Sequence, residues 1–401
     1  MGDENTGLRN SPPDPSISTT SSSPNADTPP HSALPPSRSH DPNNNLKRSD
    51  PFQFGSRYLL ADDDVFEFNA WDHVETDAEH RDYAEAQYAA QRASPVSDFD
   101  KKRFNAEPAK WWNQFYKNNS VNFFKDRKWL RQEFPALARA TQADGGPITM
   151  LEVGAGAGNT AFPILAHNLN TRLKLHACDF SKKAVDLLRA HELYDEKHIH
   201  AAEWDVAGHE LPPGLGAGSV DLVLMIFIFS ALEPSQWRQA VRNIHTLLKP
   251  GGEVLLRDYG RGDLAQVRFR KGRYLEENFY VRGDGTRVYF FDRDELASIW
   301  EGNDPADTRA EPGTGTGIGT RNGTANAQGV DGDEKKEGKG VEDEEKKEGG
   351  AKLFEPLNLG VDRRLLVNRQ RKLKMYRCWL QGRFRKVDVR PAASPATVGQ
   401  G

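Results

Sequence analysis

The sequence predicts an α/β fold in which helices cover both faces of a mostly parallel sheet. Short apolar runs alternate with amphipathic segments from about residue 146 to residue 300, as parallel sheets covered by helices require. A glycine turn, LEVGAGAGNT at 151–160, follows one of the apolar runs and precedes a predicted helix. Such a turn lets the backbone approach a ligand closely and points amide N–H groups at it. The turn therefore marks the expected ligand-binding edge of the sheet.

Five apolar runs are the predicted parallel strands: ITMLEVG (148–154), LKLHACD (173–179), HIHAAEWD (198–205), VDLVLMIFIF (220–229) and GGEVLLRDYG (251–260). Amphipathic segments at 161–169, 182–193 and 234–248 are the predicted helices between them. The last of these helices ends at a Pro-Gly break. Two further strands, 361–369 and 373–386, are expected to form a closing antiparallel hairpin, which gives a sheet of seven strands.

The composition indicates one sizeable domain with disordered additions. Only 37% of the 401 residues are hydrophobic, and the mean hydropathy is −0.73. Residues 1–50 are rich in Ser, Pro, Asn and Asp, which predicts a disordered tail, and residues 301–352 predict a disordered, charged insertion. Between them lie a helical extension at 51–145 and the α/β domain, divided into 146–300 and 353–390.

Several classes of protein are disfavoured by the sequence. No run of about 18 apolar residues is present and the start lacks a secretory signal, so we expect a cytoplasmic protein without a membrane partner. Cys178 and Cys378 are too few and too far apart for a disulfide framework, and no metal site is expected. The net charge of −4 does not indicate nucleic-acid binding, but basic groups gather in the folded part.

The spacing of the glycines indicates the cofactor. Gly154, Gly156 and Gly158 follow the pattern GxGxG, which is usual in methyltransferases that bind S-adenosylmethionine, and a nicotinamide dehydrogenase needs GxGxxG. Asp179 follows the second strand, where a carboxylate can accept both ribose hydroxyls; the alternative is a helix N-cap. Asp205 can take the adenine amino group or be a solvated turn acid. Ile226 lies at the strand end beside the expected cofactor.

Several longer segments are similar to the family of tRNA N3-methylcytidine methyltransferases. They are NAWDHVE (69–75), KWWNQFYKNNSVNFFKDRKWL (110–130), LEVGAGAGNT, ACDFS (177–181), IFIFSAL (226–232), LLKPGGEVLLRDYGRGDLAQVRF (247–269), NFYVRGDGTRVYFF (278–291) and VDRRLLVNR (361–369). GxGxG is common among methyltransferases, whereas FFKDR with RDYG and YVRGDGTR is specific to this family. FGSRYLL (54–60) followed by VFEFNAWDHVE resembles the cytosolic branch, fungal members included, that acts on threonine tRNAs and in animals also on arginine tRNAs.

The resemblance implies a class I, Rossmann-like methyltransferase that modifies cytidine 32 of the anticodon loop, with the 51–145 extension covering cofactor and tRNA. It implies cofactor contacts at Trp112, Tyr116, Gly154, Gly156, Asp179, Asp205 and Ile226. Aromatic faces attract a cationic sulfonium. Without the resemblance, the segment that contains Trp112 and Tyr116 would be interpreted as an amphipathic helix facing the core. The chain departs from the family at Ala155, where cysteine is common, and in its long insertion. A synthetase or accessory subunit is a further implied partner.

The chemistry expected of such an enzyme needs no general base, because N3 of neutral cytosine carries a free lone pair. An acid would help to accommodate the cationic product, and the candidates are Asp126 and Asp258; structural ion pairs with nearby arginines are the alternative for both. Basic residues predicted to contact tRNA phosphates are Lys125, Arg127, Arg257, Arg268, Arg282, Arg287, Arg363 and Arg364. Ordinary surface Lys and Arg remain the alternative for any one of them.

Two rival functions remain open at the level of sequence. A methyltransferase acting on a protein or small molecule would use the same glycine turn and acids. A non-catalytic tRNA-binding subunit would keep the fold without the reaction, although the complete set of cofactor residues argues against it. Cofactor titration and transfer assays with tRNA, protein and metabolite substrates separate these functions.

Overall fold

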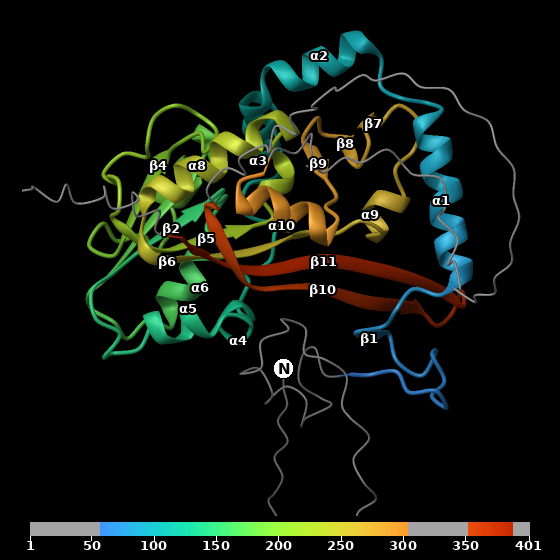
Figure 1. The fold of residues 1–401 in the computed structure, drawn as a ribbon, viewed down its shortest axis with the longest axis horizontal. Coiled ribbons are helices and arrows are strands. Elements are labelled where there is room, and N and C mark those ends of the chain that lie inside the picture. Colours follow the sequence, from blue (N-terminus) through green and yellow to red (C-terminus); the bar gives the residue numbers. More distant parts are fainter. Residues whose placement is uncertain (1–56, 304–351, 388–401) are drawn as a thin grey trace, which may run out of the picture. The chain divides into compact units, whose positions relative to one another are not determined.

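An eight-stranded sheet with the order β1-β10-β11-β6-β5-β2-β3-β4 organises the fold (Figure 1). The computed structural model describes residues 57–303 and 352–387, which belong to one compact unit of the chain. Five neighbouring strands of this sheet are parallel: β2 (Ile148–Val153), β3 (Leu173–Asp179), β4 (Ile199–Glu203), β5 (Val220–Ile226) and β6 (Leu248–Tyr259). The five predicted parallel strands are thus confirmed, and their carboxyl ends share one edge of the sheet.

The other half of the sheet is antiparallel. β11 (Leu373–Lys386) pairs with β6 and with β10 (Phe354–Asn368), which forms the predicted hairpin. The prediction missed an eighth strand, β1 (Ala70–Asp72), which the N-terminal extension adds to the outer edge of β10. β6 also begins earlier than expected, at Leu248, because the Pro-Gly break is absorbed as an irregularity in the pairing between β5 and β6 rather than ending the strand.

Helices cover both faces of the sheet, as predicted. Figure 1 shows α8 and α10 on one face and α4, α5 and α6 on the other. The helices are α1 (Ala78–Arg92), α2 (Asp98–Ala106), α3 (Pro108–Asn119), α4 (Leu130–Glu133), α5 (Pro135–Ala140), α6 (Ala161–Ala166), α7 (Lys182–Arg189), α8 (Trp237–Leu247), α9 (Leu264–Val267) and α10 (Arg293–Glu301), with short 3₁₀ turns η2 (Phe229–Ala231) and η3 (Pro234–Gln236). The first five come from the extension before β2.

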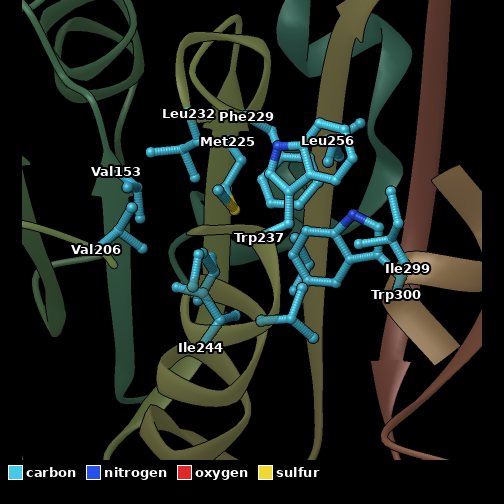
Figure 2. Close-up of a cluster of buried hydrophobic side chains, with 14 of the residues drawn as sticks. Val153, Val206, Met225, Phe229, Leu232, Trp237, Ile244, Leu256, Ile299 and Trp300 are labelled. Carbon is cyan, nitrogen blue, oxygen red and sulfur yellow. The ribbon is translucent and has the colours of Figure 1, made fainter. Parts of the chain in front are cut away.

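The larger hydrophobic core lies between the sheet and the helices α8 and α10 (Figure 2). Trp237 of α8 and Trp300 of α10 are fully buried, and both rings contact Phe229, the third residue after the end of β5. Burying side chains of this size contributes on the order of 2–3 kcal/mol each. This packing fixes the turn after β5 rigidly beneath the carboxyl edge of the sheet.

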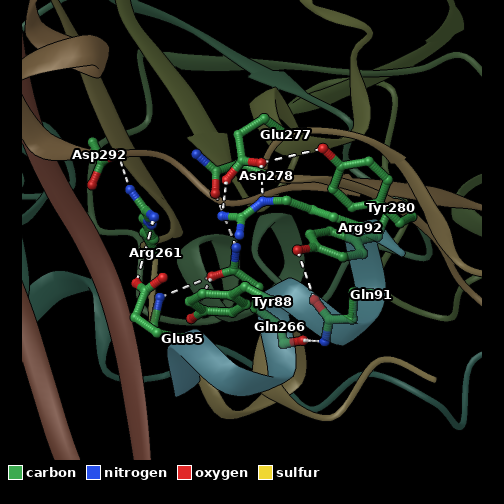
Figure 3. Close-up of polar contacts among 12 residues, drawn as sticks. Glu85, Tyr88, Gln91, Arg92, Arg261, Gln266, Glu277, Asn278, Tyr280 and Asp292 are labelled. Carbon is green, nitrogen blue, oxygen red and sulfur yellow. Dashed lines mark hydrogen bonds and ion pairs between the residues drawn. The ribbon is translucent and has the colours of Figure 1, made fainter. Parts of the chain in front are cut away.

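A separate three-stranded sheet, β7 (Tyr274–Glu276), β8 (Phe279–Val281) and β9 (Arg287–Tyr289), was not predicted from the sequence. The helix α1 docks between this sheet and α9 through buried polar contacts (Figure 3). Gln91 donates to the carbonyl of Gln266 over 3.0 Å and accepts from the Tyr280 hydroxyl over 2.9 Å. Because both ends of these contacts are buried and satisfied, the extension is held firmly against the α/β domain.

Some expectations concern segments beyond this description. The predicted disorder of residues 1–50 and of most of 301–352 lies outside the described residues. Within 57–303 and 352–387, no helix has the length and apolar character needed to cross a membrane. In the same ranges, no group of three or more His, Cys, Asp and Glu side chains is arranged to hold a metal ion.

Candidate active site

A cavity lies at the carboxyl ends of β2, β3 and β5, with an empty volume of about 1280 Å³ that includes the open solvent at its mouth. Its floor is the glycine turn after β2, and α3 of the extension forms one wall. The end of β5 and the segment between β8 and β9, which lies against Trp111 of α3, also line it. Ligands of open α/β sheets bind at this edge, because the loops that follow parallel strands meet there.

All three glycines of the turn adopt a left-handed backbone that other residues enter only with strain. Gly154 has φ +66° and Gly156 has φ +58°. A Cβ atom at Gly154 would lie 2.4 Å from Ile228, and one at Gly156 would lie 2.5 Å from the Tyr116 hydroxyl. Both positions line the cavity, so glycine keeps the backbone bare where a ligand approaches. The GxGxG pattern is thus required by close packing as well as by conformation.

The two acids selected from the sequence both line the cavity. The Asp179 carboxylate accepts hydrogen bonds from the backbone N–H groups of Gly156 and Ser181, each over 2.8 Å. Burial raises the pKa of Asp179 to about 6, although these two hydrogen bonds act in the opposite direction. Asp205 accepts from the N–H of Ala207 over 2.9 Å and is half-buried. Asp179 therefore joins the second strand end to the glycine turn while facing the cavity.

The aromatic pair of the extension lies over the turn. Pro108 occupies the first turn of α3, where its missing N–H costs nothing, and the helix directs Trp112 and Tyr116 into the cavity. The two ring centroids are 6.2 Å apart, and Tyr116 is buried, which raises its pKa well above the usual value. Ile226, at the end of β5, lines the cavity too and is 3% exposed. Residues from three distant parts of the chain thus converge on one volume.

The two candidate catalytic acids do not line the cavity. Asp126 is exposed, and its carboxylate accepts a hydrogen bond from Asn159 over 3.2 Å. Asp258 is fully buried and accepts from the backbone N–H groups of Ser230 and Tyr259 over 2.9 and 2.8 Å. Burial raises the pKa of Asp258 to about 6. Both carboxylates hold neighbouring loops in place. The alternative role, an ion pair with a nearby arginine, is not found for either acid among the described residues.

The eight predicted phosphate contacts fall into different environments. Arg127, Arg282 and Arg287 line the cavity, whereas Lys125 and Arg268 are exposed on the surface. Arg363 and Arg364 are half-buried and form ion pairs with Glu75 and Asp72 at the docked extension. These two arginines therefore hold the extension to the hairpin, which a reading of surface charge could not anticipate.

Two of the predicted contacts are too deeply buried to reach a phosphate on the surface. Arg257 is 3% exposed, pairs with Asp362 over 2.5 Å and is sandwiched between the rings of Trp129 and Trp379. Arg287 is also 3% exposed and pairs with Glu233 over 3.4 Å, and burial lowers its pKa. Arg257 is thus a structural residue, because its charge is already neutralised inside the fold.

A buried glutamate lies behind the glycine turn. Glu152, in β2, is 1% exposed, and burial raises its pKa to about 7, with Arg127 as the nearest opposing charge. Arg127 is held by a hydrogen bond from its guanidinium to the Thr160 hydroxyl over 2.9 Å. Its side chain therefore faces the cavity from a fixed position instead of extending toward solvent.

Sequence reasoning missed several residues that line the cavity. Phe227 and Tyr259 are the most prominent, because both line the cavity and their ring centroids lie 5.0 Å apart. Both belong to segments that resemble the family, IFIFSAL and RDYG. An aromatic residue next to a buried strand end has no signal of its own, since core packing explains it equally well.

Comparison with known proteins adds to this geometry. Residues 151–254 match the family model described as a methyltransferase domain. A tRNA N(3)-methylcytidine methyltransferase of Schizosaccharomyces pombe is 41% identical over 333 residues, which cover 83% of this chain and 92% of that protein. The tRNA(Thr) (cytosine(32)-N(3))-methyltransferase of Saccharomyces cerevisiae is 46% identical over 341 residues, or 84% of this chain. This chain spans 46% of the length of that relative.

Among solved structures, a SAM-dependent methyltransferase from Anabaena variabilis aligns with a TM-score of 0.42 and 11% sequence identity. The alignment covers 73% of this chain and 97% of that one.

Proposed function

The chain belongs to the family of tRNA N(3)-methylcytidine methyltransferases, and we propose that it transfers a methyl group from S-adenosylmethionine to N3 of cytidine 32 in a tRNA anticodon loop. The observation that carries the proposal is the cavity, in which the glycine turn, the acids and the aromatic pair meet at the edge of the sheet. The threonine tRNAs are the proposed substrates, since the Saccharomyces cerevisiae relative is named for them.

The residues present fit an adenosine-bearing sulfonium. The bare backbone at Gly154 and Gly156 leaves room that a Cβ would fill, and Asp179 faces that room with oxygens able to accept from ribose hydroxyls. We assign the adenine edge to Asp205 and the side of the sulfonium to Trp112 and Tyr116, whose faces favour a cation. Ile226 provides an apolar contact beside the reacting atoms.

The chain has little covalent chemistry to perform in this reaction. The cofactor supplies a methyl group on a cationic sulfur, and the in-plane lone pair of neutral N3 accepts it without first losing a proton. The protein must hold the two reactants in line and keep water out, a positioning effect that can supply several kcal/mol of the rate enhancement. The rigid turn after β5, packed on Trp237 and Trp300, suits that task.

Asp126 and Asp258 enter the proposal as positioning residues. Asp258 ties Ser230, which follows β5, to Tyr259 at the end of β6, and both of these residues line the cavity. Asp126 holds Asn159, the residue that follows the glycine turn. Replacing either acid should disturb the cavity walls rather than remove a group that touches the base.

Binding of tRNA is proposed to use the exposed basic residues beside the cavity, with Lys125 and Arg268 as phosphate contacts and Arg127 and Arg282 nearer the target nucleotide. The extension at 51–145 would cover both cofactor and tRNA.

We extend the proposal to a synthetase or accessory subunit that presents the tRNA. We also propose a cytoplasmic location, where the buried free thiols Cys178 and Cys378 meet a reducing environment. Fractionation and co-purification test these last two points.

The decisive experiment compares tRNAs from cells with and without this protein. Loss of N3-methylcytidine at position 32 of the threonine tRNAs, restored by the wild-type chain but not by an Asp179→Ala variant, is the expected outcome. Purified protein should methylate the same tRNAs and leave protein and metabolite extracts unlabelled. Unchanged modification in the deletion strain would refute the proposal, and labelling of proteins or metabolites would favour the rival enzyme.

A further inference from the structure

The part of the cavity lining that follows β5 has an unusual backbone. Phe227, the first residue after β5, has φ +59°, a left-handed conformation in which a bulky side chain is a genuine outlier. Strain of this kind persists only where the surroundings enforce it, and it gathers at functional sites. Here the N–H of Phe227 donates to the carbonyl of Arg257 over 2.8 Å, and Asp258 holds Ser230 three residues later.

The strained residue lines the cavity and also packs against the edge of a hydrophobic core cluster. Phe227 is half-buried and lines the cavity, whereas Phe229, two residues later, is fully buried against Trp237. The Phe227 ring lies 5.0 Å from that of Tyr259 at an angle of 50°, and Tyr259 lines the cavity as well. Together, Phe227 and Tyr259 form an aromatic wall of the cavity.

Two guanidinium groups flank this aromatic wall. That of Arg127 lies 5.9 Å from the centre of the Phe227 ring, and that of Arg282 lies 5.8 Å from the centre of the Tyr259 ring. Each group carries hydrogen-bond donors, which suit the carbonyl oxygen of a pyrimidine or a nearby phosphate. The wall therefore offers apolar ring faces with hydrogen-bond donors beside each ring, and Trp112 and Tyr116 line the same cavity.

We propose that the target cytosine stacks on the wall formed by Phe227 and Tyr259, and that Phe227 is the residue that positions it for attack. This inference rests on the proposed function and adds the site where the base binds. A base that has left the anticodon stack needs an aromatic surface to replace its lost contacts. The same faces favour the product, because methylation at N3 leaves a positive charge on the ring and aromatic faces attract cations.

The test uses purified full-length protein with saturating S-adenosylmethionine and a threonine tRNA transcript. Phe227→Leu keeps the apolar volume and removes the ring, so the single-turnover rate should fall on the order of 10- to 100-fold, the range that stacking of one base supports. Phe227→Tyr keeps the ring and should restore the rate to within about threefold of wild type. Cofactor affinity measured by calorimetry should change less than about twofold in both variants, since the cofactor contacts lie elsewhere.

Two further variants separate stacking from stability. Phe227→Gly removes both the ring and the strained backbone, so it should lose the rate, while relief of the strain offsets part of the lost packing in the midpoint of thermal unfolding. Lys372→Gly relieves a similar left-handed backbone, φ +51°, at the hairpin tip, and should leave the rate unchanged. A wild-type rate in Phe227→Leu, or an equal loss in Phe227→Tyr, would overturn the inference. Failure of the wild-type chain to methylate any tRNA would instead refute the proposed function.

Discussion

Replacing Gly156 with alanine tests the packing of the cofactor turn most directly. Gly156 has φ +58°, and a Cβ atom there would lie 2.5 Å from the hydroxyl oxygen of Tyr116. The next atom of that side chain, ring carbon Cζ, would lie 3.4 Å from the Cβ, which is ordinary contact. The clash therefore belongs to a single oxygen, and Tyr116→Phe should remove it.

The cost of the alanine has two parts. Holding alanine in a left-handed backbone costs about 1–2 kcal/mol. Forcing a buried side chain to move aside costs about 1–3 kcal/mol more, so Gly156→Ala should lower the free energy of unfolding by about 2–5 kcal/mol. The double variant Gly156→Ala with Tyr116→Phe should recover the second part and keep only the first. Gly218, with φ +63° and no atom within 4 Å of an added Cβ, is the matched control for the backbone part alone.

The assay is urea unfolding of all four members of the cycle and of Gly218→Ala, followed by titration with S-adenosylmethionine. A coupling energy of about 1–3 kcal/mol between positions 156 and 116 is expected, because the two groups overlap directly. Cofactor affinity should fall in Gly156→Ala and recover in part in the double variant. A coupling energy below about 0.5 kcal/mol would refute the argument, since the alanine would then cost only its backbone strain.

Four further predictions concern charge. The pKa of Asp179, raised to about 6 by burial, predicts that S-adenosylmethionine binds more tightly as pH rises through about 6, because only the ionised carboxylate accepts from both hydroxyls; Asp179→Asn should flatten this dependence in calorimetry. The same pKa lies above its unfolded value of 3.8. Without cofactor, the contribution of Asp179 to the free energy of unfolding should therefore decrease as the pH rises from about 4 to about 6, which urea unfolding at several pH values will measure. Asp362→Ala removes the carboxylate that pairs with the buried Arg257 charge and should lower the free energy of unfolding by about 3–5 kcal/mol. In filter-binding titrations against salt, Arg268→Ala should reduce the slope of log affinity by about 1, whereas Arg364→Ala should lower stability with little change in slope.

The central sheet could be predicted because its strands are continuous apolar runs bounded by turns, a pattern that burial on both faces imposes. β1 and the sheet of β7, β8 and β9 could not, because each strand has three residues and its pairing depends on partners far away in the chain. The pairing of Ala70 with Leu366, for example, joins the extension to the hairpin. No local pattern contains that information.

The candidate site likewise has a part that could be predicted from the sequence and a part that could not. Asp179 and the glycines follow strands directly, so their convergence follows from topology alone. The charged residues were less predictable, since burial of an arginine depends on a partner chosen by the fold. Arg257 finds Asp362 at a separation of 105 residues, and Arg287 finds Asn105 at a separation of 182. Basic residues quoted from a motif can therefore be structural, and the exposed fraction decides between the two roles.

The helical extension gives the cavity a property that the sheet alone would lack. The sheet edge supplies the glycine turn and the acids, but Trp112 and Tyr116 reach the cavity only while α3 is in place. The extension is also anchored away from α3. Its residue Gln91 contacts α9 and β8, and its residue Asp72 pairs with Arg364 of the hairpin. A contact that shifts these anchors would therefore change cofactor affinity without touching the cofactor. Since Lys125 lies on the same extension, tRNA docking and cofactor binding are expected to be coupled, each strengthening the other by an equal factor.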